Sequence, residues 1–121
     1  MPAARRRSPI VVYVAGPYRA ATPKAEAANI RRAAQAAAAI WAIGFVALCP
    51  HLNSPKDPPL SRRLILRGDL ELMRRCDAIF LIEGWKASPG ALAEYAEAAR
   101  LGMCVFHSMK SLRVFAARGR L

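Results

Sequence analysis

The sequence predicts a small α/β domain in which helices cover both faces of a parallel β-sheet. Three observations support this prediction: four short apolar runs typical of buried strands, helical apolar spacing between the runs, and Gly or Pro residues at the junctions. Strands that alternate with helices at this spacing are joined by right-handed crossovers, so the strands lie parallel. A chain of 121 residues fits one such domain.

The first strand and the helix after it have clear limits. Residues 10–15 form a continuous apolar run rich in Val and Ile, the pattern of a strand buried on both faces. Thr22 followed by Pro23 is typical of a helix start, where a side chain caps the helix and proline fits the first turn. We expect this helix to end at Gly44. Its apolar positions recur at helical spacing: Ile30, Ala34, Ala37 and Trp41.

The rest of the chain continues the alternation. We expect a second strand (45–49), a proline-rich loop (50–59), a helix (61–76), a third strand (78–82), an exit loop (83–90), a helix from 88 to 102, a fourth strand (103–107) and a short C-terminal helix. Gly68 is a point at which the second helix could split. The whole pattern is that of a small doubly wound sheet of the flavodoxin or Rossmann-like type.

The charge balance is strongly basic, with 19 Lys and Arg against 8 Asp and Glu and a formal net charge of +11. Such a surface attracts anions, so nucleotides, phosphates and nucleic acids are all candidate ligands. The basic residues are mostly dispersed and few aromatic residues lie between them, which disfavours a dedicated nucleic-acid surface. Residues 1–9 are expected to form a basic flexible tail ahead of a single domain at residues 10–121.

The sequence predicts neither a metal site nor a membrane span. Cys49, Cys76 and Cys104 are far apart and no clustered His/Cys spacing occurs, so we expect free thiols and no bound metal. The alanine-rich run at residues 33–49 is broken by Gly44 and is short for a membrane span, which needs about 20 apolar residues. No signal peptide is evident at the N-terminus, so we expect a cytoplasmic protein.

The expected fold would gather polar residues at one edge of the sheet. In doubly wound folds, ligands bind beyond the carboxyl ends of the strands, where the strand order reverses. Four polar stretches fall at those ends: residues 16–19, His51, residues 83–90 and Ser108. We therefore expect a single cleft there, opened by the Gly-Pro turn that follows the first strand.

The segment SPGALAE, residues 88–94, is the most informative stretch of the chain. Ser88 would cap a helix whose free N–H groups and positive dipole end favour a bound anion, and Gly90 would let a ligand approach the backbone closely. Glu94 lies about 9 Å further along the helix, a distance that fits the reach from a nucleotide phosphate to the sugar C1′. Taken alone, Glu94 is more simply interpreted as an ordinary exposed glutamate, as is Glu97.

Two aspartates in the stretch DLELMRRCD have different expected roles. Asp77 directly precedes the third strand, where an aspartate commonly caps a turn. Asp69 has basic neighbours, so an ion pair is one interpretation of it. Cleavage of a glycosidic bond, however, needs two carboxyl groups, one for an oxocarbenium-like centre and one for the proton of the leaving group. Asp69 is the best available partner for Glu94.

Several motifs resemble one known superfamily. Three stretches are similar to the nucleoside 2-deoxyribosyltransferase-like superfamily: YVAGPYR with Asn29 in the following helix, GFVALCPH, and DLELMRRCDAIFLIEGWKASPGALAEYAEAARLG. The part of the last stretch from CDAIF onward is especially similar to the DUF4406-type branch. The resemblance covers most of the chain, and the S-x-G-A-x-x-E segment is its most specific part. It implies the same doubly wound fold.

The resemblance also implies a role for each matching residue. Glu94 matches the nucleophilic glutamate, Tyr13 matches a tyrosine that orients it, and Asp69 matches the aspartate that assists protonation of the leaving base. The implied substrate-binding residues are Gly16, Pro17, Tyr18, Arg19, His51, Ser88 and Gly90. Members of the superfamily pair so that one subunit completes its neighbour's site, so a homodimer or higher homo-oligomer is expected, with Trp41 on the long helix as a candidate contact.

Ser88 differs from the residue usual in enzymes that act on free nucleosides. Those transferases usually carry an aspartate that holds the 5′-hydroxyl, whereas the nucleoside 5′-monophosphate N-glycosidases of the superfamily carry a serine. A serine at a helix start can donate a hydrogen bond to a phosphate, which an aspartate would repel. Ser88, Arg19 and the net charge of +11 therefore favour a nucleotide.

The sequence thus predicts an N-glycosidase that hydrolyses a nucleoside or deoxynucleoside 5′-monophosphate to free base and sugar 5-phosphate, with no metal or cofactor. Three alternatives stay open: transfer of the deoxyribosyl group to another base, a non-catalytic nucleotide-binding module, and a basic nucleic-acid-binding protein. The last is the least favoured, for the reasons of charge pattern given above.

Overall fold

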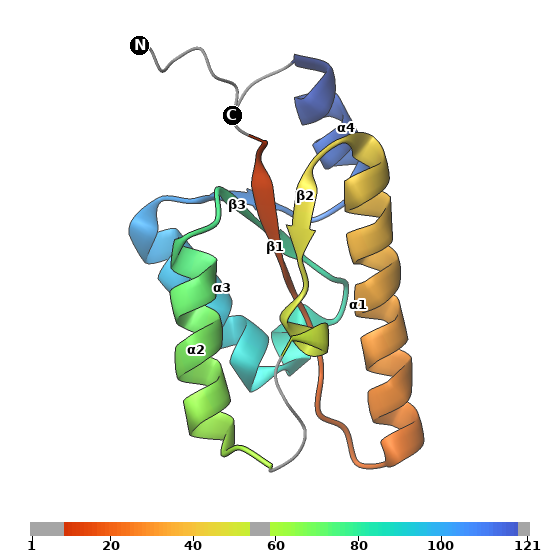
Figure 1. Ribbon diagram of the computed structural model, residues 1–121, viewed down its shortest axis with the longest axis vertical. Helices are drawn as coiled ribbons and strands as arrows, with labels where there is room; N and C mark the ends of the chain where they lie inside the picture. Colours follow the sequence, from red (N-terminus) through yellow and green to blue (C-terminus); the bar gives the residue numbers. More distant parts are fainter. Residues whose placement is uncertain (1–8, 54–58, 119–121) are drawn as a thin grey trace.

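A computed structural model describes residues 9–53 and 59–118 and contains one parallel sheet. Its strands are Val11–Ala15 (β1), Val46–Leu48 (β2), Ala78–Leu81 (β3) and Cys104–Phe106 (β4). The strand order is β2-β1-β3-β4, so the chain leaves β1 on one side and later returns to its other side (Figure 1). The order of winding therefore reverses between β1 and β3.

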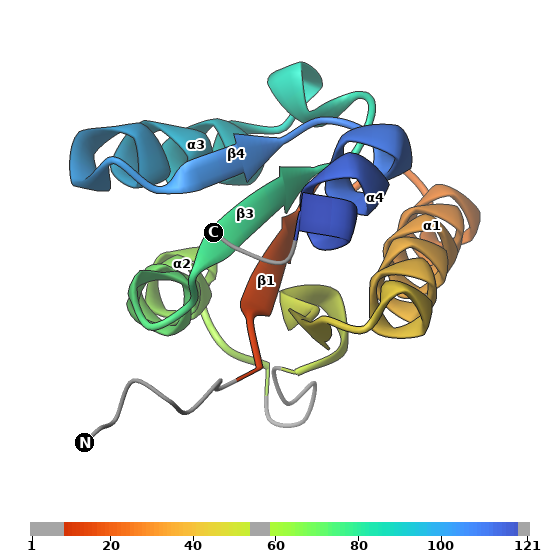
Figure 2. The same cartoon turned by 90° about the horizontal axis from the view of Figure 1, so that it is seen from above.

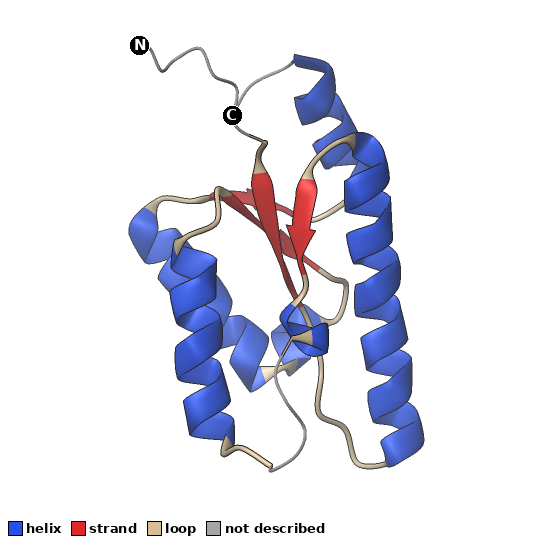
Figure 3. Ribbon diagram, viewed as in Figure 1, coloured by secondary structure: helices blue, strands red, loops and turns tan. Residues whose placement is uncertain are grey.

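Helices cover both faces of the sheet, which confirms the predicted doubly wound fold. The helices are Pro23–Ile43 (α1), Arg62–Arg74 (α2), Pro89–Leu101 (α3) and Met109–Arg118 (α4), with short 3₁₀ turns at Pro50–Leu52 (η2) and Trp85–Ala87 (η3). α1 and α4 lie on one side of the sheet, whereas α2 and α3 lie on the other (Figure 2). Figure 3 shows the same arrangement coloured by secondary structure.

The structure has two hydrophobic cores, one on each face of the sheet, and the central strand β1 contributes side chains to both. Val12 and Val14 are fully buried in the cluster that contains α1 and α4 residues. Tyr13 and Ala15 point to the opposite face and are fully buried in the cluster that contains residues of α2 and α3. Because successive residues of a strand point to opposite faces, this register places the Tyr13 ring against α2 and α3.

The predicted helix caps are present. The side chains of Thr22, Ser61 and Ser88 accept hydrogen bonds from backbone N–H groups three residues later, at 3.1, 3.1 and 3.2 Å. α1 and α3 end at Gly44 and Gly102, which have positive φ values of 116° and 69° that favour glycine. Capping therefore fixes where α2 and α3 begin, and these two ends form part of the site described below.

Two features of the helices differ from the sequence prediction. α2 is continuous through Gly68, which lies in open space and therefore does not split the helix. The buried face of α1 consists of Ala33, Ala37 and Ile40, whereas Trp41 is 55% exposed. The predicted buried positions Ala34 and Trp41 are therefore each off by one residue from the observed Ala33 and Ile40. The cause is that an alanine-rich helix offers little contrast between its faces.

The loops add smaller corrections. The proline-rich segment predicted as a loop begins with the turn η2, and the exit loop after β3 contains η3. Residues 1–8, most of the predicted basic tail, lie outside the described residues, and the division into tail and domain stays a prediction. Within the described part of the chain, no helix combines the length and apolar character needed to cross a membrane.

Asp77 joins the starts of β1 and β3. Its carboxylate accepts a hydrogen bond from the Val11 N–H at 2.8 Å, and its own N–H donates to the Val11 carbonyl at 2.8 Å. The structural role predicted for Asp77 is therefore confirmed.

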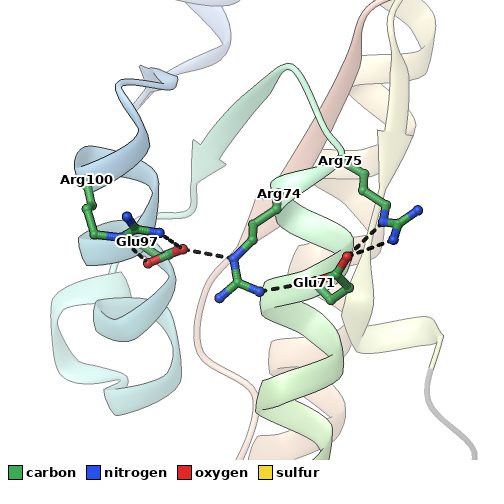
Figure 4. Close-up of polar contacts among 5 residues, drawn as sticks. All are labelled: Glu71, Arg74, Arg75, Glu97 and Arg100. Atoms are coloured by element: carbon green, nitrogen blue, oxygen red, sulfur yellow. Dashed lines mark hydrogen bonds and ion pairs between the residues drawn. The ribbon is translucent and has the colours of Figure 1, made fainter.

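An ion-pair network holds α2 and α3 side by side (Figure 4). The Arg74 Nε donates to Glu97 at 2.9 Å, and Arg100 pairs with both Glu97 oxygens, at 2.9 and 2.7 Å. On α2, Glu71 also pairs with Arg74 and Arg75. Ion pairs at the surface are screened by water and contribute little to stability, so their main effect is on alignment. The sequence indicated that Glu97 is an ordinary exposed glutamate. In the structure it instead links two helices.

The contact of Gly16 with Ile82 yields a stability prediction. A Cβ at Gly16 would lie 2.9 Å from the Ile82 Cβ, which is attached directly to the backbone and cannot turn away. We expect Gly16→Ala to lower the free energy of unfolding by ~1–3 kcal/mol, measured by urea denaturation. The matched control is Gly68→Ala, which fills open space within α2 and should raise it by ~0.5–1 kcal/mol. Equal stability of Gly16→Ala and wild type would contradict the close contact.

Candidate active site

A cleft of about 280 Å³ opens beyond the carboxyl ends of β1 and β3, where the strand order reverses. All the predicted site residues except Tyr13 line it: Gly16, Pro17, Tyr18 and Arg19 after β1, His51 in η2, Asp69 on α2, and Ser88, Gly90 and Glu94 at the start of α3. Tyr13 lies beneath the cleft, inside the core. The predicted convergence is therefore observed for these residues, whereas Ser108 and residues 83–86, which were expected at the same cleft, do not line it.

Glu94 is buried against the central strand. It is only 6% exposed, and one of its oxygens, Oε2, accepts a hydrogen bond from the hydroxyl of the fully buried Tyr13. The simpler sequence interpretation, an ordinary exposed glutamate, is therefore wrong for this residue. Glu94 also lines the cleft, and its second carboxyl oxygen, Oε1, is not bonded to Tyr13.

The two carboxyl groups of the cleft have raised pKa values. Burial raises the pKa of Glu94 to about 8, the hydrogen bond from Tyr13 acts in the opposite direction, and the charge of Asp69 raises it further. Burial raises the pKa of Asp69 to about 6. Within the described residues Asp69 has no ion-pair partner, so the salt bridge considered from its basic neighbours is absent there. Both groups therefore exchange protons near neutral pH.

His51 and Asn29 hold the loop after β1. The Nε2–H of His51 donates to the carbonyl oxygen of Pro17 at 2.9 Å, and the side-chain amide of Asn29 donates to the carbonyl of Tyr18 at 3.0 Å. The Tyr18 and His51 rings meet edge to face, with centroids 5.4 Å apart. Burial lowers the pKa of His51, which keeps the ring neutral, and its buried Nδ1 has no hydrogen-bond partner among the described residues.

The start of α3 and the β1 loop supply groups suited to an anion. Ser88 caps α3: its side-chain oxygen accepts from the Ala91 N–H and its carbonyl accepts from the Leu92 N–H. Since Pro89 has no N–H, the Gly90 N–H is the first-turn donor that these bonds leave for an anion. A Cβ at Gly90 would meet only the Ser88 oxygen, at 4.0 Å, so the backbone there is open to the cleft. The guanidinium carbon of Arg19 lies 6.0 Å from the centre of the Tyr18 ring and is exposed.

Sequence reasoning missed one wall of the cleft. Arg62, Ile65 and Leu66 of α2 line it together with Asp69. These four residues are spaced at i, i+3, i+4 and i+7, so they share one face of the helix. None of Arg62, Ile65 and Leu66 was among the site residues predicted from the sequence. One sequence signal could have identified this wall: on one face of the helix, the apolar residues Ile65 and Leu66 lie between two charged residues, Arg62 and Asp69.

The lining of the cleft combines three kinds of group. It contains two carboxyl groups, Glu94 and Asp69, the apolar side chains of α2, and two arginines together with the capped start of α3. Within the described residues, no cluster of three or more His, Cys, Asp and Glu is arranged to hold a metal ion. Such a lining suits a ligand that has an apolar part and an anionic group.

The opposite influences of Tyr13 and Asp69 on Glu94 can be measured directly. In a ¹³C NMR titration of the side-chain carboxyls, we expect Glu94 to titrate near its raised pKa of about 8. Tyr13→Phe should raise this pKa further, because a donor to the charged form is lost, and Asp69→Asn should lower it, because a nearby negative charge is removed.

Glu97 serves as an internal control in the same spectra. Hydrogen bonds from Arg100 and Arg74 lower its pKa to about 2, so its signal should stay constant across neutral pH. A Glu94 midpoint near the ordinary glutamate value of about 4.3, or shifts of the same sign in both variants, would contradict the described geometry.

Comparisons with solved structures identify the fold. A 2-deoxyribosyltransferase from Leishmania mexicana matches 80% of this chain at 24% sequence identity with a TM-score of 0.55, and this chain spans only 62% of that protein. A 2-deoxyribosyltransferase from the psychrotolerant bacterium Bacillus psychrosaccharolyticus matches 85% of this chain and 90% of its own length, at 15% identity with a TM-score of 0.61. At these identities the likeness establishes a shared fold.

The comparison with protein families covers most of the chain. No curated protein matches the sequence. The family model that matches is described as a domain of unknown function, DUF7768, which is a different model from the DUF4406-type branch that the motifs resemble. Since this model matches residues 10–108, the chain belongs to the DUF7768 family.

Proposed function

We propose that this protein is an N-glycosidase that hydrolyses a nucleoside or deoxynucleoside 5′-monophosphate to free base and sugar 5-phosphate. One observation carries the proposal: the buried Tyr13–Glu94 pair lies at the sheet end of a cleft that also contains Asp69. This is the pair of carboxyl groups that cleavage of a glycosidic bond requires. The fold shared with two 2-deoxyribosyltransferases gives independent support for chemistry at the same bond.

In the proposed first step, a Glu94 carboxylate oxygen attacks C1′ of the sugar. The C1′–N bond breaks, its electron pair goes to the base, and a glycosyl ester forms on Glu94. Tyr13 holds Oε2 by its hydrogen bond, which orients the carboxylate and favours the ionised form that attacks.

Asp69 is proposed to supply the proton for the departing base. Because the pKa of Asp69 is about 6 and that of Glu94 is about 8, the reactive pair, a protonated Asp69 beside an ionised Glu94, is a minority of the population at neutral pH. In the second step, water attacks C1′ of the glycosyl ester and gives its proton to the Asp69 carboxylate. The sugar 5-phosphate leaves and both carboxyl groups return to their starting states, so no oxidant, metal or other cofactor enters the reaction.

Ser88 and Arg19 are proposed to bind the 5′-phosphate. The cap of α3 lies six residues, about 9 Å, before Glu94 along the helix, which matches the span from C1′ to the phosphate. The Gly90 N–H at the start of α3 and an arginine in the same cleft both favour an anion. His51 and Tyr18 also line the cleft and are proposed to contact the base.

Transfer of the deoxyribosyl group to a second base is the alternative that the neighbours' names favour. The two reactions share the glycosyl ester and differ only in the group that attacks it. Incubation with a monophosphate in the presence and absence of a second free base separates them, because only a transferase forms a new nucleotide. A nucleotide-binding module would bind the monophosphate without releasing base, and a nucleic-acid-binding protein would show steeply salt-dependent affinity for DNA or RNA.

The expected homo-oligomer and the cytoplasmic location stay predictions. The 55% exposure of Trp41 on α1 leaves this side chain available for contact between subunits, as the dimer hypothesis requires. A monomer in light scattering at tens of micromolar would argue against the dimer.

Substitution of the two carboxylates tests the proposed chemistry. With a panel of monophosphates assayed by chromatography, we expect Glu94→Gln to abolish base release, because the amide is no nucleophile. Asp69→Asn should lower the rate by ~100-fold, the usual size of lost acid assistance, with the largest loss for poor leaving bases. Glu83→Gln, which neutralises an exposed carboxylate outside the cleft, is the matched control and should retain activity. Near wild-type turnover by Glu94→Gln would exclude the mechanism.

The substrate class is tested by the charge at position 88. Ser88→Asp and Ser88→Asn both keep a capping oxygen, but only the first places a negative charge against the phosphate. In calorimetric titrations, we expect the aspartate to weaken monophosphate binding by ~1–3 kcal/mol relative to the asparagine and to leave binding of the free nucleoside unchanged. Equal losses for both ligands would mean general damage to the site, and unchanged monophosphate affinity would place the phosphate elsewhere.

A further inference from the structure

We propose that Arg62 contacts the 5′-phosphate and is a specificity-determining residue of this site, an inference that rests on the proposed function. Arg62 is the first residue of α2 and lines the same cleft as Ser88 and Glu94. It belongs to the wall that the sequence prediction missed, and the chemistry at Glu94 and Asp69 does not use it.

The relative placement of α2 and α3 is the first support. Both helices lie on the same face of the parallel sheet, and Figure 1 shows both starting at the lower side of the molecule, where the cleft-lining loops are. The Arg74–Glu97 ion pair joins their later turns at 2.9 Å, which aligns the helices along their length (Figure 4). The starts of α2 and α3 therefore lie at the same end of the site.

The spacing of functional groups along these two helices matches. On α3, Ser88 precedes Glu94 by six residues, about 9 Å. On α2, Arg62 precedes Asp69 by seven residues, about 10 Å. A ligand whose C1′ lies between the two carboxyl groups would therefore carry its 5′-phosphate to the level of both Ser88 and Arg62.

The charge at Arg62 is the second support. Within the described residues, Arg62 has no ion-pair partner, and the first turn of α2 contains no acidic residue. A cation in the first turn is unfavourable for the helix dipole, so helix stability does not explain this residue. A guanidinium can form two parallel hydrogen bonds to phosphate oxygens, which explains why a substrate with a phosphate would be preferred to one without.

Arg63 provides a matched control. It carries the same charge on the same turn of α2 but does not line the cleft. Arg62→Gln and Arg63→Gln therefore change the net charge equally and differ only in position. Both side chains are exposed, so folding is expected to be retained, and thermal melting checks this for each variant.

The experiment measures binding of 2-deoxyribose 5-phosphate, with 2-deoxyribose as the phosphate-free control, by NMR titration at fixed ionic strength. We expect Arg62→Gln to raise the Kd of the sugar phosphate by about 10-fold or more, the range of a lost charge-assisted hydrogen bond, and Arg63→Gln to change it by less than about twofold. Arg62→Lys, which keeps the charge but loses the planar fork, should lie between them. Neither glutamine variant should alter the weak binding of 2-deoxyribose.

Equal effects of Arg62→Gln and Arg63→Gln would overturn the inference, since they would reflect general charge attraction. Failure of the wild type to prefer the sugar phosphate over the free sugar would overturn it as well. Base release by the wild type is assayed separately and decides the proposed function. If the wild type releases base but the Kd does not change in Arg62→Gln, the inference about Arg62 is wrong and the proposed function still holds. Arg62-dependent binding without base release would reject hydrolysis and leave the phosphate contact in place.

Discussion

The hydrogen bond between Tyr13 and Glu94 is the interaction on which the site depends. It joins the central strand to α3 inside the core, and it holds a carboxyl group that would otherwise be buried without a partner. Because folding raises the pKa of Glu94 from 4.5 to about 8, the folded state binds more protons than the unfolded state between these values. The contribution of this group to stability is therefore complete below about pH 4.5 and is lost progressively as pH rises to about 8. The protein therefore gives up stability at neutral pH to keep a carboxyl group in a nearly dry site, as expected for a group kept for chemistry.

The doubly wound topology places the Tyr13–Glu94 pair at a cleft. β1 places Tyr13 on the face that α2 and α3 cover, and the reversal of strand order places the loop after β1 beside the start of α3. α2 then brings Asp69 and Arg62 to the same cleft from one face of a single helix. The ion pairs among Glu71, Arg74, Glu97 and Arg100 contribute little free energy, yet they tie together the two helices that carry the carboxyl groups.

Local signals in the sequence predicted the elements well, and tertiary contacts set the limits of that prediction. Capping serines and terminal glycines identified the starts and ends of the helices, because these signals act within three or four residues. The face of α1 was misjudged, since alanine fills both of its sides. The burial of Glu94 could not be read from its own helix, because the partner hydroxyl lies 81 residues earlier in the chain. Arg62 was missed for a similar reason: its role depends on how α2 packs beside α3.

The central claim, nucleophilic attack by Glu94, is tested most directly by trapping the glycosyl ester. A 2′-deoxy-2′-fluoro-arabinonucleoside 5′-monophosphate would slow breakdown of the ester, because the fluorine destabilises the oxocarbenium-like transition state through which water attacks. Mass spectrometry of the intact and digested protein then locates the adduct. The account predicts a mass increase of one fluorinated sugar phosphate on the peptide that contains Glu94, and no adduct in Glu94→Gln. Base release without an adduct, or an adduct on another residue, would contradict it.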